Sequence, residues 1–183
     1  MNINPRLNRL QSDYEKIREL ESRSPMISIV KTMGGNPPTG YIFRLTCQGI
    51  TRLSNGRPAY SEQHELKMIL QADYPRAQPT MEMLTPIFHP NFNGRTICIG
   101  HSYSPAMGLD DLLVEIIKLI IYENYNLASA YNHEAVDWAK RNKKLFPLDK
   151  RQIVGKDPQI EVFEEINIID NSDDLIKDID IFS

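Results

Sequence analysis

Residues 86–98 read PIFHPNFNGRTIC, and this stretch decides the fold of the chain. A helix is excluded over its first half, because proline lacks an N–H donor and clashes with the preceding turn. The stretch is nevertheless apolar, with Ile87, Phe88 and Phe92 close together. We therefore expect an irregular segment that packs against the body of the protein and leads to Cys98.

The sequence before this stretch predicts an antiparallel sheet. Apolar residues alternate with polar ones in a way that is typical of half-buried strands. The expected strands are residues 26–33, 41–47, 64–70 and 80–84. Turn residues at Gly34–Pro38 and Ser54–Gly56 punctuate the connections. Because the turns between successive strands are short, the pattern predicts a four-stranded antiparallel meander, with residues 49–56 as a connection.

Helical periodicity appears on both sides of the expected sheet. Residues 5–22 predict an amphipathic helix that Pro5 opens, with Leu7, Leu10, Tyr14, Ile17 and Leu20 on its apolar face. Residues 109–121 carry a wide apolar stripe that is typical of a central, buried helix. Residues 134–145 predict a surface helix anchored by Trp138. The fold class is therefore α+β, with an N-terminal helix, the meander and C-terminal helices.

Length and charge divide the chain into a body and a tail. Its 183 residues suit one domain with room for an extension, and we expect the domain to cover residues 1–150. Residues 151–183 hold three basic and nine acidic residues, so their net charge is −6. Because the whole chain has a net charge of −3, residues 1–150, the body, have a net charge of +3. We expect this acidic extension to be partly docked or flexible. The body is too weakly basic to favour nucleic acid.

Several classes of protein are disfavoured by what the sequence lacks. No apolar run approaches the ~18–20 residues of a membrane span, and the first ten residues lack the apolar core of a signal peptide. The two cysteines and four histidines show no metal-binding spacing, so we expect neither a metal nor another cofactor. We expect a cytoplasmic protein whose cysteines remain thiols in a reducing compartment.

Cys98 is the candidate nucleophile, although a lone cysteine is more often a small buried hydrophobic residue. Its position at the end of a kinked segment favours a reactive role. The amide of Asn91 could donate to a developing oxyanion or pin a loop. His89 could be a base, but a structural histidine in the loop is favoured. We expect Cys47 in the core, and His64 and His133 at the surface.

The ordered motifs resemble the ubiquitin-conjugating (E2) enzyme family. Tyr74-Pro75 and Pro79 precede a strand that leads to His89-Pro90-Asn91, as in the family's TxIxHPN segment. Thr96–Ile99 is similar to the stretch around the family's active cysteine, and Ser104–Ala106 to its Ser-Pro-Ala loop. Asn132–Ala135 is similar to its Asn-Pro-Glu-Ala motif. The resemblance runs in order over residues 5–147.

The resemblance implies a UBC-like fold, an E2-like (UBC) catalytic domain and an acyl-transfer mechanism. Cys98 would accept a ubiquitin-like protein as a thioester from an E1 enzyme, which would bind the face of the N-terminal helix. It would then transfer that acyl group to an amine of an acceptor protein. Asn91 would support the loop and the oxyanion, and His89 belongs to the same site.

This chain departs from the family pattern in three places. The interval from His89-Pro90-Asn91 to Cys98 is one residue shorter than is usual in eukaryotes. No carboxylate occurs in residues 124–131, where the family often has an acidic residue, so Ser129 or Asn126 is expected to replace it. Arg76-Ala77 and Tyr103 replace the residues that usually face an E3, which counts against E3 binding. The overall pattern is similar to E2-like proteins of bacterial conjugation operons.

Two other functions remain open at this point. A non-catalytic E2 variant would bind ubiquitin-like proteins without transferring them, although such variants usually lack the cysteine. A Cys-His hydrolase would need a base beside the thiol, and His89, His101 and His133 are the candidates.

Overall fold

A computed structural model describes residues 4–99, 103–127 and 130–155 of the chain. It contains helix α1 (Pro5–Arg23), eight strands and two further α-helices, α2 (Leu109–Ile120) and α3 (His133–Arg141). The strands are β1 (Ile27–Met33), β2 (Gly40–Leu45), β3 (Gly49–Ser54), β4 (Arg57–Ser61), β5 (His64–Ile69), β6 (Thr80–Met83), β7 (Phe92–Asn93) and β8 (Thr96–Ile97). A 3₁₀ turn, Lys143–Leu145, follows α3. The expected α+β fold is confirmed.

The main sheet has the strand order β1-β2-β5-β6-β8-β7, and each neighbouring pair is antiparallel. The four expected strands are its first four members, in the expected order. The fifth and sixth, β8 and β7, are two-residue strands within the segment that we expected to be irregular. This short hairpin extends the sheet toward Cys98, which directly follows β8.

The connection expected at residues 49–56 is itself part of a hairpin. Strands β3 and β4 form a separate two-stranded sheet. Asn55 and Gly56, at its tip, both have a positive φ (51° and 76°), which suits the tight turns that join antiparallel strands. The Asn-Gly pair is a strong hairpin signal.

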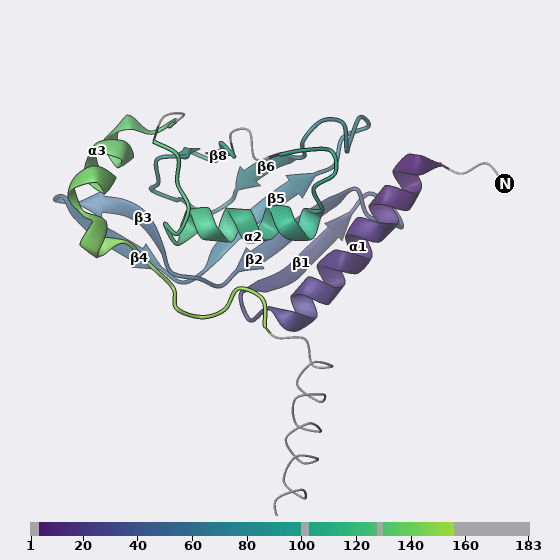
Figure 1. Cartoon of the computed structure of the whole chain (residues 1–183), viewed down its shortest axis with the longest axis horizontal. Coiled ribbons are helices and arrows are strands. Elements are labelled where there is room, and N and C mark those ends of the chain that lie inside the picture. The colour runs from purple at the N-terminus through teal and green to yellow at the C-terminus, as the bar shows by residue number, and fades with distance from the viewer. Residues whose placement is uncertain (1–3, 100–102, 128–129, 156–183) are drawn as a thin grey trace, which may run out of the picture.

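One hydrophobic core joins the sheet to α1 and α2. Helix α2 lies across the sheet and α1 runs beside β1, while α3 lies next to β3 and β4 (Figure 1). The core includes alternate residues of β2 and β5 together with most of α2, so the expectation of a central helix is confirmed. A smaller cluster, Ile50, Phe88, Tyr122, Ala135, Trp138 and Ala139, packs α3 onto the segment before Asn91.

Two expectations about single residues are wrong. His64 is fully buried rather than at the surface, because it continues the inward alternation of Leu66 and Met68 along β5. Its ring hydrogen-bonds the carbonyl oxygen of Ser61 at 3.2 Å. Leu7 is largely exposed, since the first turn of α1 extends past the core. His133 is exposed, as expected.

The first residues of the expected extension pack on the body. Ile153 and Val154 contact the core, and the amide of Gly155 donates to the carbonyl oxygen of Arg23 at 2.9 Å. Residues 156–183, where the apolar part of the extension was expected to dock, lie outside the described residues, so the boundary at residue 150 stays a prediction. In the described part of the chain, no helix is long and apolar enough to cross a membrane.

Candidate active site

Cys98 lies immediately after β8 and is half-buried. Its backbone N–H donates to the carbonyl oxygen of Asn91 at 2.8 Å. The β7–β8 hairpin turns the chain back between these two residues, and Phe92 pairs with Ile97. Asn91 and Cys98 are therefore held next to each other, as their order in the sequence led us to expect.

The side chain of Asn91 holds a second loop beside the first. Its Nδ2 donates to the carbonyl oxygen of Asn126 at 2.9 Å, and its Oδ1 accepts from the Asn126 amide at 2.9 Å. Asn91 is 1% exposed, so water competes little for these bonds. Of the two roles open to this amide, loop pinning is the one that the geometry displays. One Nδ2 hydrogen is used in this way, which leaves the second for another acceptor.

The neighbouring proline strengthens the same junction. The carbonyl oxygen of Pro90 accepts from the amides of Tyr131 and Asn132 at 2.9 and 3.0 Å. Asn132 also caps α3, where its Oδ1 accepts from the Ala135 amide at 3.0 Å. The middle and the C-terminal end of the loop between α2 and α3 are thus attached to the chain just before Cys98.

His89 is fully buried beneath this junction. Its Nδ1 accepts the Asn91 amide at 3.0 Å, and its ring contacts Phe92 and Tyr122 edge to face, with centroids 5.3 and 4.4 Å away. Burial lowers the pKa of His89 to about 3, so the ring is neutral at ordinary pH. A buried, neutral ring that accepts a backbone hydrogen bond supports the loop, which is the structural role we favoured from the sequence.

Tyr122 connects the segment that contains His89 with the end of α2 and with α3. It directly follows the residue that caps α2 and adopts a positive φ of 59°. Its hydroxyl donates to the carbonyl oxygen of Phe88 at 2.7 Å, and its ring contacts Trp138 and Phe146. This aromatic group ties the end of α2 and the start of the His89 segment together.

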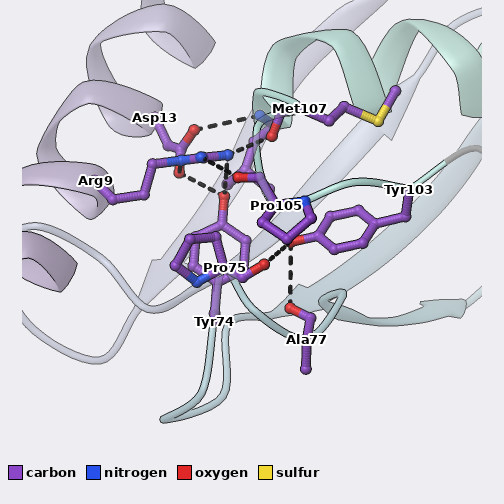
Figure 2. Close-up of polar contacts among 9 residues, drawn as sticks. Arg9, Asp13, Tyr74, Pro75, Ala77, Tyr103, Pro105 and Met107 are labelled. Atoms are coloured by element: carbon purple, nitrogen blue, oxygen red, sulfur yellow. Dashed lines mark hydrogen bonds and ion pairs between the residues drawn. The ribbon is translucent and has the colours of Figure 1, made fainter.

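The chain beyond Cys98 is anchored to α1 by a partly buried polar cluster (Figure 2). Arg9 donates from Nε to Asp13 at 2.7 Å, from Nη1 to the Pro105 carbonyl at 2.7 Å, and from Nη2 to the Met107 carbonyl. The Tyr74 hydroxyl donates to the same Asp13 carboxylate at 2.5 Å. Burial, together with the hydrogen bond to Asp13, raises the pKa of Tyr74 far above its usual value. These contacts fix the segment that leads into α2.

Tyr103 links the same segment to the loop after Tyr74. Its hydroxyl lies 2.6 Å from the Pro75 carbonyl oxygen and 3.2 Å from that of Ala77, so its single proton is shared between two acceptors (Figure 2). The two regions where the family's E3-facing residues would fall are therefore joined by hydrogen bonds. Whether an E3 binds there stays a prediction.

The structure brings the backbone of Cys98 to Asn91 and the ring of His89 to the Asn91 amide. The roles of these three residues in a reaction stay predictions. Ser129 and His101 lie outside the described residues. Asn126 is exposed and bonded through its backbone to Asn91. Asp13, which is 1% exposed, was not among the residues that we expected from the sequence. A signal was present, because Asp13 falls between Leu10 and Ile17 on the apolar face of α1.

Comparison with known proteins identifies a family. The model of the ubiquitin-conjugating enzyme family matches residues 9–154, most of the chain. The chain is 32% identical over 149 residues to ubiquitin-conjugating enzyme E2 S-B of Xenopus laevis, with 70% of each protein covered. It is 33% identical over 132 residues to ubiquitin-conjugating enzyme E2 S of Branchiostoma floridae, covering 63% of this chain and 61% of that protein. The expected similarity to a bacterial branch stays a prediction.

Solved structures with low sequence identity share the fold. A ubiquitin conjugating enzyme of Trypanosoma cruzi superimposes with a TM-score of 0.55 and 19% identity, covering 80% of this chain and 96% of that one. The E2 domain of a Toxoplasma gondii ubiquitin conjugating enzyme gives a TM-score of 0.52 and 21% identity, with 76% and 89% covered. The expected UBC-like fold is therefore confirmed.

Proposed function

The chain belongs to the ubiquitin-conjugating enzyme family, and from this premise we propose that it carries a ubiquitin-like protein as a thioester on Cys98. In this proposal, an E1 enzyme supplies the modifier with its C-terminal carboxyl already activated. Cys98 accepts that carboxyl and passes it to an amine on an acceptor protein. Membership of the family implies partners of these three general kinds.

The proposed chemistry is two successive acyl transfers. The Cys98 thiolate attacks the carbonyl carbon of the E1-bound thioester, and the E1 thiolate leaves. An amine then attacks the new thioester carbonyl, the Cys98 thiolate leaves, and the amine nitrogen loses a proton. Each step passes through a tetrahedral oxyanion, which a positioned N–H donor stabilises.

The observation that carries the proposal is the junction of Asn91 with Cys98 and Asn126. A single buried side chain holds the loop before α3 against the turn whose end bears the half-buried thiol. Positioning of this kind lowers the barrier to acyl transfer, because the attacking group and its donors are already oriented. Asn91 is thus proposed to organise the loop and, through its remaining Nδ2 hydrogen, to stabilise the oxyanion.

The positions of the basic residues on α1 indicate which side of this helix could bind the E1. Arg6 donates to the carbonyl oxygens of Leu70 and Gln71, and Arg9 is used in the cluster around Asp13. These two cations hold the helix to the body. Lys16 and Arg18 are exposed, and we assign them to the E1-facing side of α1.

The second proposed step, transfer of the acyl group from Cys98 to an amine, departs further from the family pattern than the first. Because residues 124–131 contain no carboxylate, Asn126 or Ser129 is proposed to orient the incoming amine in place of the usual acidic residue. The proposed transfer does not depend on an E3, since Arg76, Ala77 and Tyr103 depart from the family's E3-facing pattern. The two cysteines form no disulfide with each other, which suits the proposed cytoplasmic location, where thiols stay reduced.

The geometry of His89 counts against the hydrolase alternative. A base must be able to take a proton from the thiol, whereas His89 is fully buried and its Nδ1 already accepts the Asn91 amide. A non-catalytic variant is disfavoured by the presence of Cys98 in register with the family's active cysteine. We therefore keep acyl transfer as the proposed activity.

The test is a non-reducing gel after incubation with an E1, ATP and candidate ubiquitin-like proteins. We expect a thiol-sensitive band that Cys98→Ala abolishes and that Cys98→Ser converts into a thiol-resistant oxyester band. Failure of every matched pair of E1 and modifier to form an adduct would favour the non-catalytic variant. Cleavage of a thioester or peptide substrate without any E1 would favour the hydrolase.

A further inference from the structure

Four cations gather at the C-terminal end of α3. They lie in the last turn of the helix and in the 3₁₀ turn that follows it, and all are exposed. We call residues 140–144 the basic patch; its cations are Lys140, Arg141, Lys143 and Lys144. Together with Asn142 and Leu145 they surround a surface hollow of about 490 Å³. The lining of this hollow contains no acidic residue.

These charges are not neutralised within the described part of the chain. None of the ion pairs found there involves the basic patch. Arg141 instead donates from Nε to the backbone carbonyl of Asp137 at 2.9 Å. The exposed carboxylates of α3, on Glu134 and Asp137, do not line the hollow. Four like charges around one hollow repel one another, and an anionic partner would relieve that repulsion.

The same chain contains a strongly acidic segment. Residues 156–183 carry two basic residues, Lys156 and Lys177, and nine acidic ones, so their net charge is 2 − 9 = −7. The segment follows Gly155, which is fixed to the end of α1. Its 28 residues could extend to about 90 Å, whereas a domain of this size has a radius of gyration of about 15 Å. Chain length therefore places the basic patch within reach.

A second groove lies closer to this point but has the wrong charge. It occupies about 270 Å³ between α1 and α2, and Val154 contributes to its wall. Lys16 and Arg23 line it, but so do three acidic residues, Glu19, Asp110 and Asp111. The lining therefore sums to −1 and would repel an acidic segment. Of the two hollows, the one at the basic patch is complementary in charge.

We propose that residues 157–183 dock on the basic patch of their own chain. Single exposed ion pairs contribute little, so the interaction would be weak between separate molecules. Within one chain the tether supplies an effective concentration in the millimolar range, which is enough to populate a weak contact. Because the contact is electrostatic and exposed, salt should release it. This proposal is independent of the proposed acyl transfer.

Zero-length crosslinking of the full chain with a carbodiimide tests the proposal, because the reagent joins only a lysine to a carboxylate in direct contact. We expect peptides that link Lys140, Lys143 or Lys144 to acidic residues of 157–183, recovered from the monomer band at low salt. Their yield should fall at least about fivefold in 0.5 M NaCl, where the Debye length is only a few ångströms. Lys16 and Lys31, which are also exposed, serve as reference lysines.

A charge reversal that spares the reactive lysines makes the test sharper. Arg141→Glu should lower the yield of these crosslinks several-fold, whereas Arg76→Glu, at another exposed arginine, should leave it unchanged. Equal yields at Lys16 and Lys31, crosslinks only between two chains, or insensitivity to salt would each overturn the proposal. A separate measurement uses labelled single-stranded DNA as an alternative anionic partner. If this DNA binds, if Arg141→Glu weakens its binding, and if the crosslinks to residues 157–183 are absent, the proposal is also overturned.

Discussion

Each of the two cysteines of this chain comes shortly after a strand, but their environments differ. Cys47 follows β2, is fully buried and belongs to the core, whereas Cys98 follows β8 and is half-buried. Burial, with a smaller effect of Asp149, raises the pKa of Cys47 to about 12. A rise from 9.0 to about 12 lowers the thiolate population about a thousandfold at neutral pH. The comparison teaches that burial after the core strand β2 makes the Cys47 thiol unreactive, whereas the position of Cys98 after the edge hairpin leaves its thiol partly accessible.

The largest expected effect is on adduct formation. Cys98→Ala should abolish the thiol-sensitive adduct with a ubiquitin-like protein, because the proposed acyl acceptor is gone. Cys47→Ala should retain the adduct while lowering the free energy of unfolding by about 1 kcal/mol, since a buried sulfur is lost. Non-reducing gels and chemical denaturation measure the two quantities. An adduct that persists in Cys98→Ala but disappears in Cys47→Ala would reverse the comparison.

Alkylation compares the two thiols without any partner protein. With iodoacetamide under native conditions at pH 7.5, we expect Cys98 to react at least about 100-fold faster than Cys47, which is buried and almost entirely protonated. Peptide mass spectrometry over time gives both rates from one sample. Unfolding in guanidinium chloride should bring the rates together, and similar rates in the folded protein would contradict the assignment.

A smaller effect is expected when the support of Cys98 is removed. Asn91→Ala loses both bonds to Asn126, and we expect acyl transfer to an amine to slow about 10- to 100-fold because the loop is no longer held. Asn93→Ala is the matched control, since Asn93 is exposed two residues away. Single-turnover discharge of the adduct gives the rates. Equal slowing in the two variants would show that Asn91 has no special place in the site.

Asn91→Asp tests the Nδ2 donor of this side chain apart from its Oδ1 acceptor. The variant keeps the Oδ1 acceptor for the Asn126 amide but loses the Nδ2 donor. If the Nδ2 donor matters, through the bond to the Asn126 carbonyl or through the oxyanion, discharge in Asn91→Asp should be as slow as in Asn91→Ala. A rate close to that of the unchanged protein would leave only the contact of Oδ1 with the Asn126 amide.

The last expected effect is on stability at high pH. A folded-state pKa of about 12 for Cys47 means that only the unfolded chain releases this proton between about pH 9 and pH 12. The stability associated with the protonated thiol is complete below pH 9 and is lost as pH rises through this window. Compared with Cys47→Ala, the unchanged protein should lose up to about 1.4 kcal/mol more per pH unit there. Denaturation curves at a series of pH values test this, and parallel curves would contradict it.

Local periodicity was sufficient to predict most of the fold. The helix expected at residues 5–22 is observed at Pro5–Arg23, and that expected at 109–121 is observed at Leu109–Ile120. These patterns are decided within a few residues by burial of one face. The β3–β4 hairpin was missed although Asn55-Gly56 marks it, and His64 was misplaced although it shares the alternation of β5.

The candidate site was predictable only in part, because its contacts are distant in sequence. Cys98 and Asn91 are close along the chain, so their proximity followed from the short segment between them. The hydrogen bonds between Asn91 and Asn126 join residues that are 35 positions apart, and the bond from Arg9 to Pro105 joins residues that are 96 positions apart. Pairings of this kind depend on how α1 and α2 dock on the sheet, which no local pattern encodes.

The reciprocal bonds between Asn91 and Asn126 also bear on the order of folding. Closing a loop of this length carries an entropic cost of about 3 kcal/mol, so the contact is expected to form after the helix between the two residues has packed. A nascent or partly unfolded chain would thus carry its thiol without the groups that orient a substrate. We therefore expect acyl transfer only from the completely folded chain. Substitutions that unfold α2 should abolish the activity even when Cys98, Asn91 and Asn126 are unchanged.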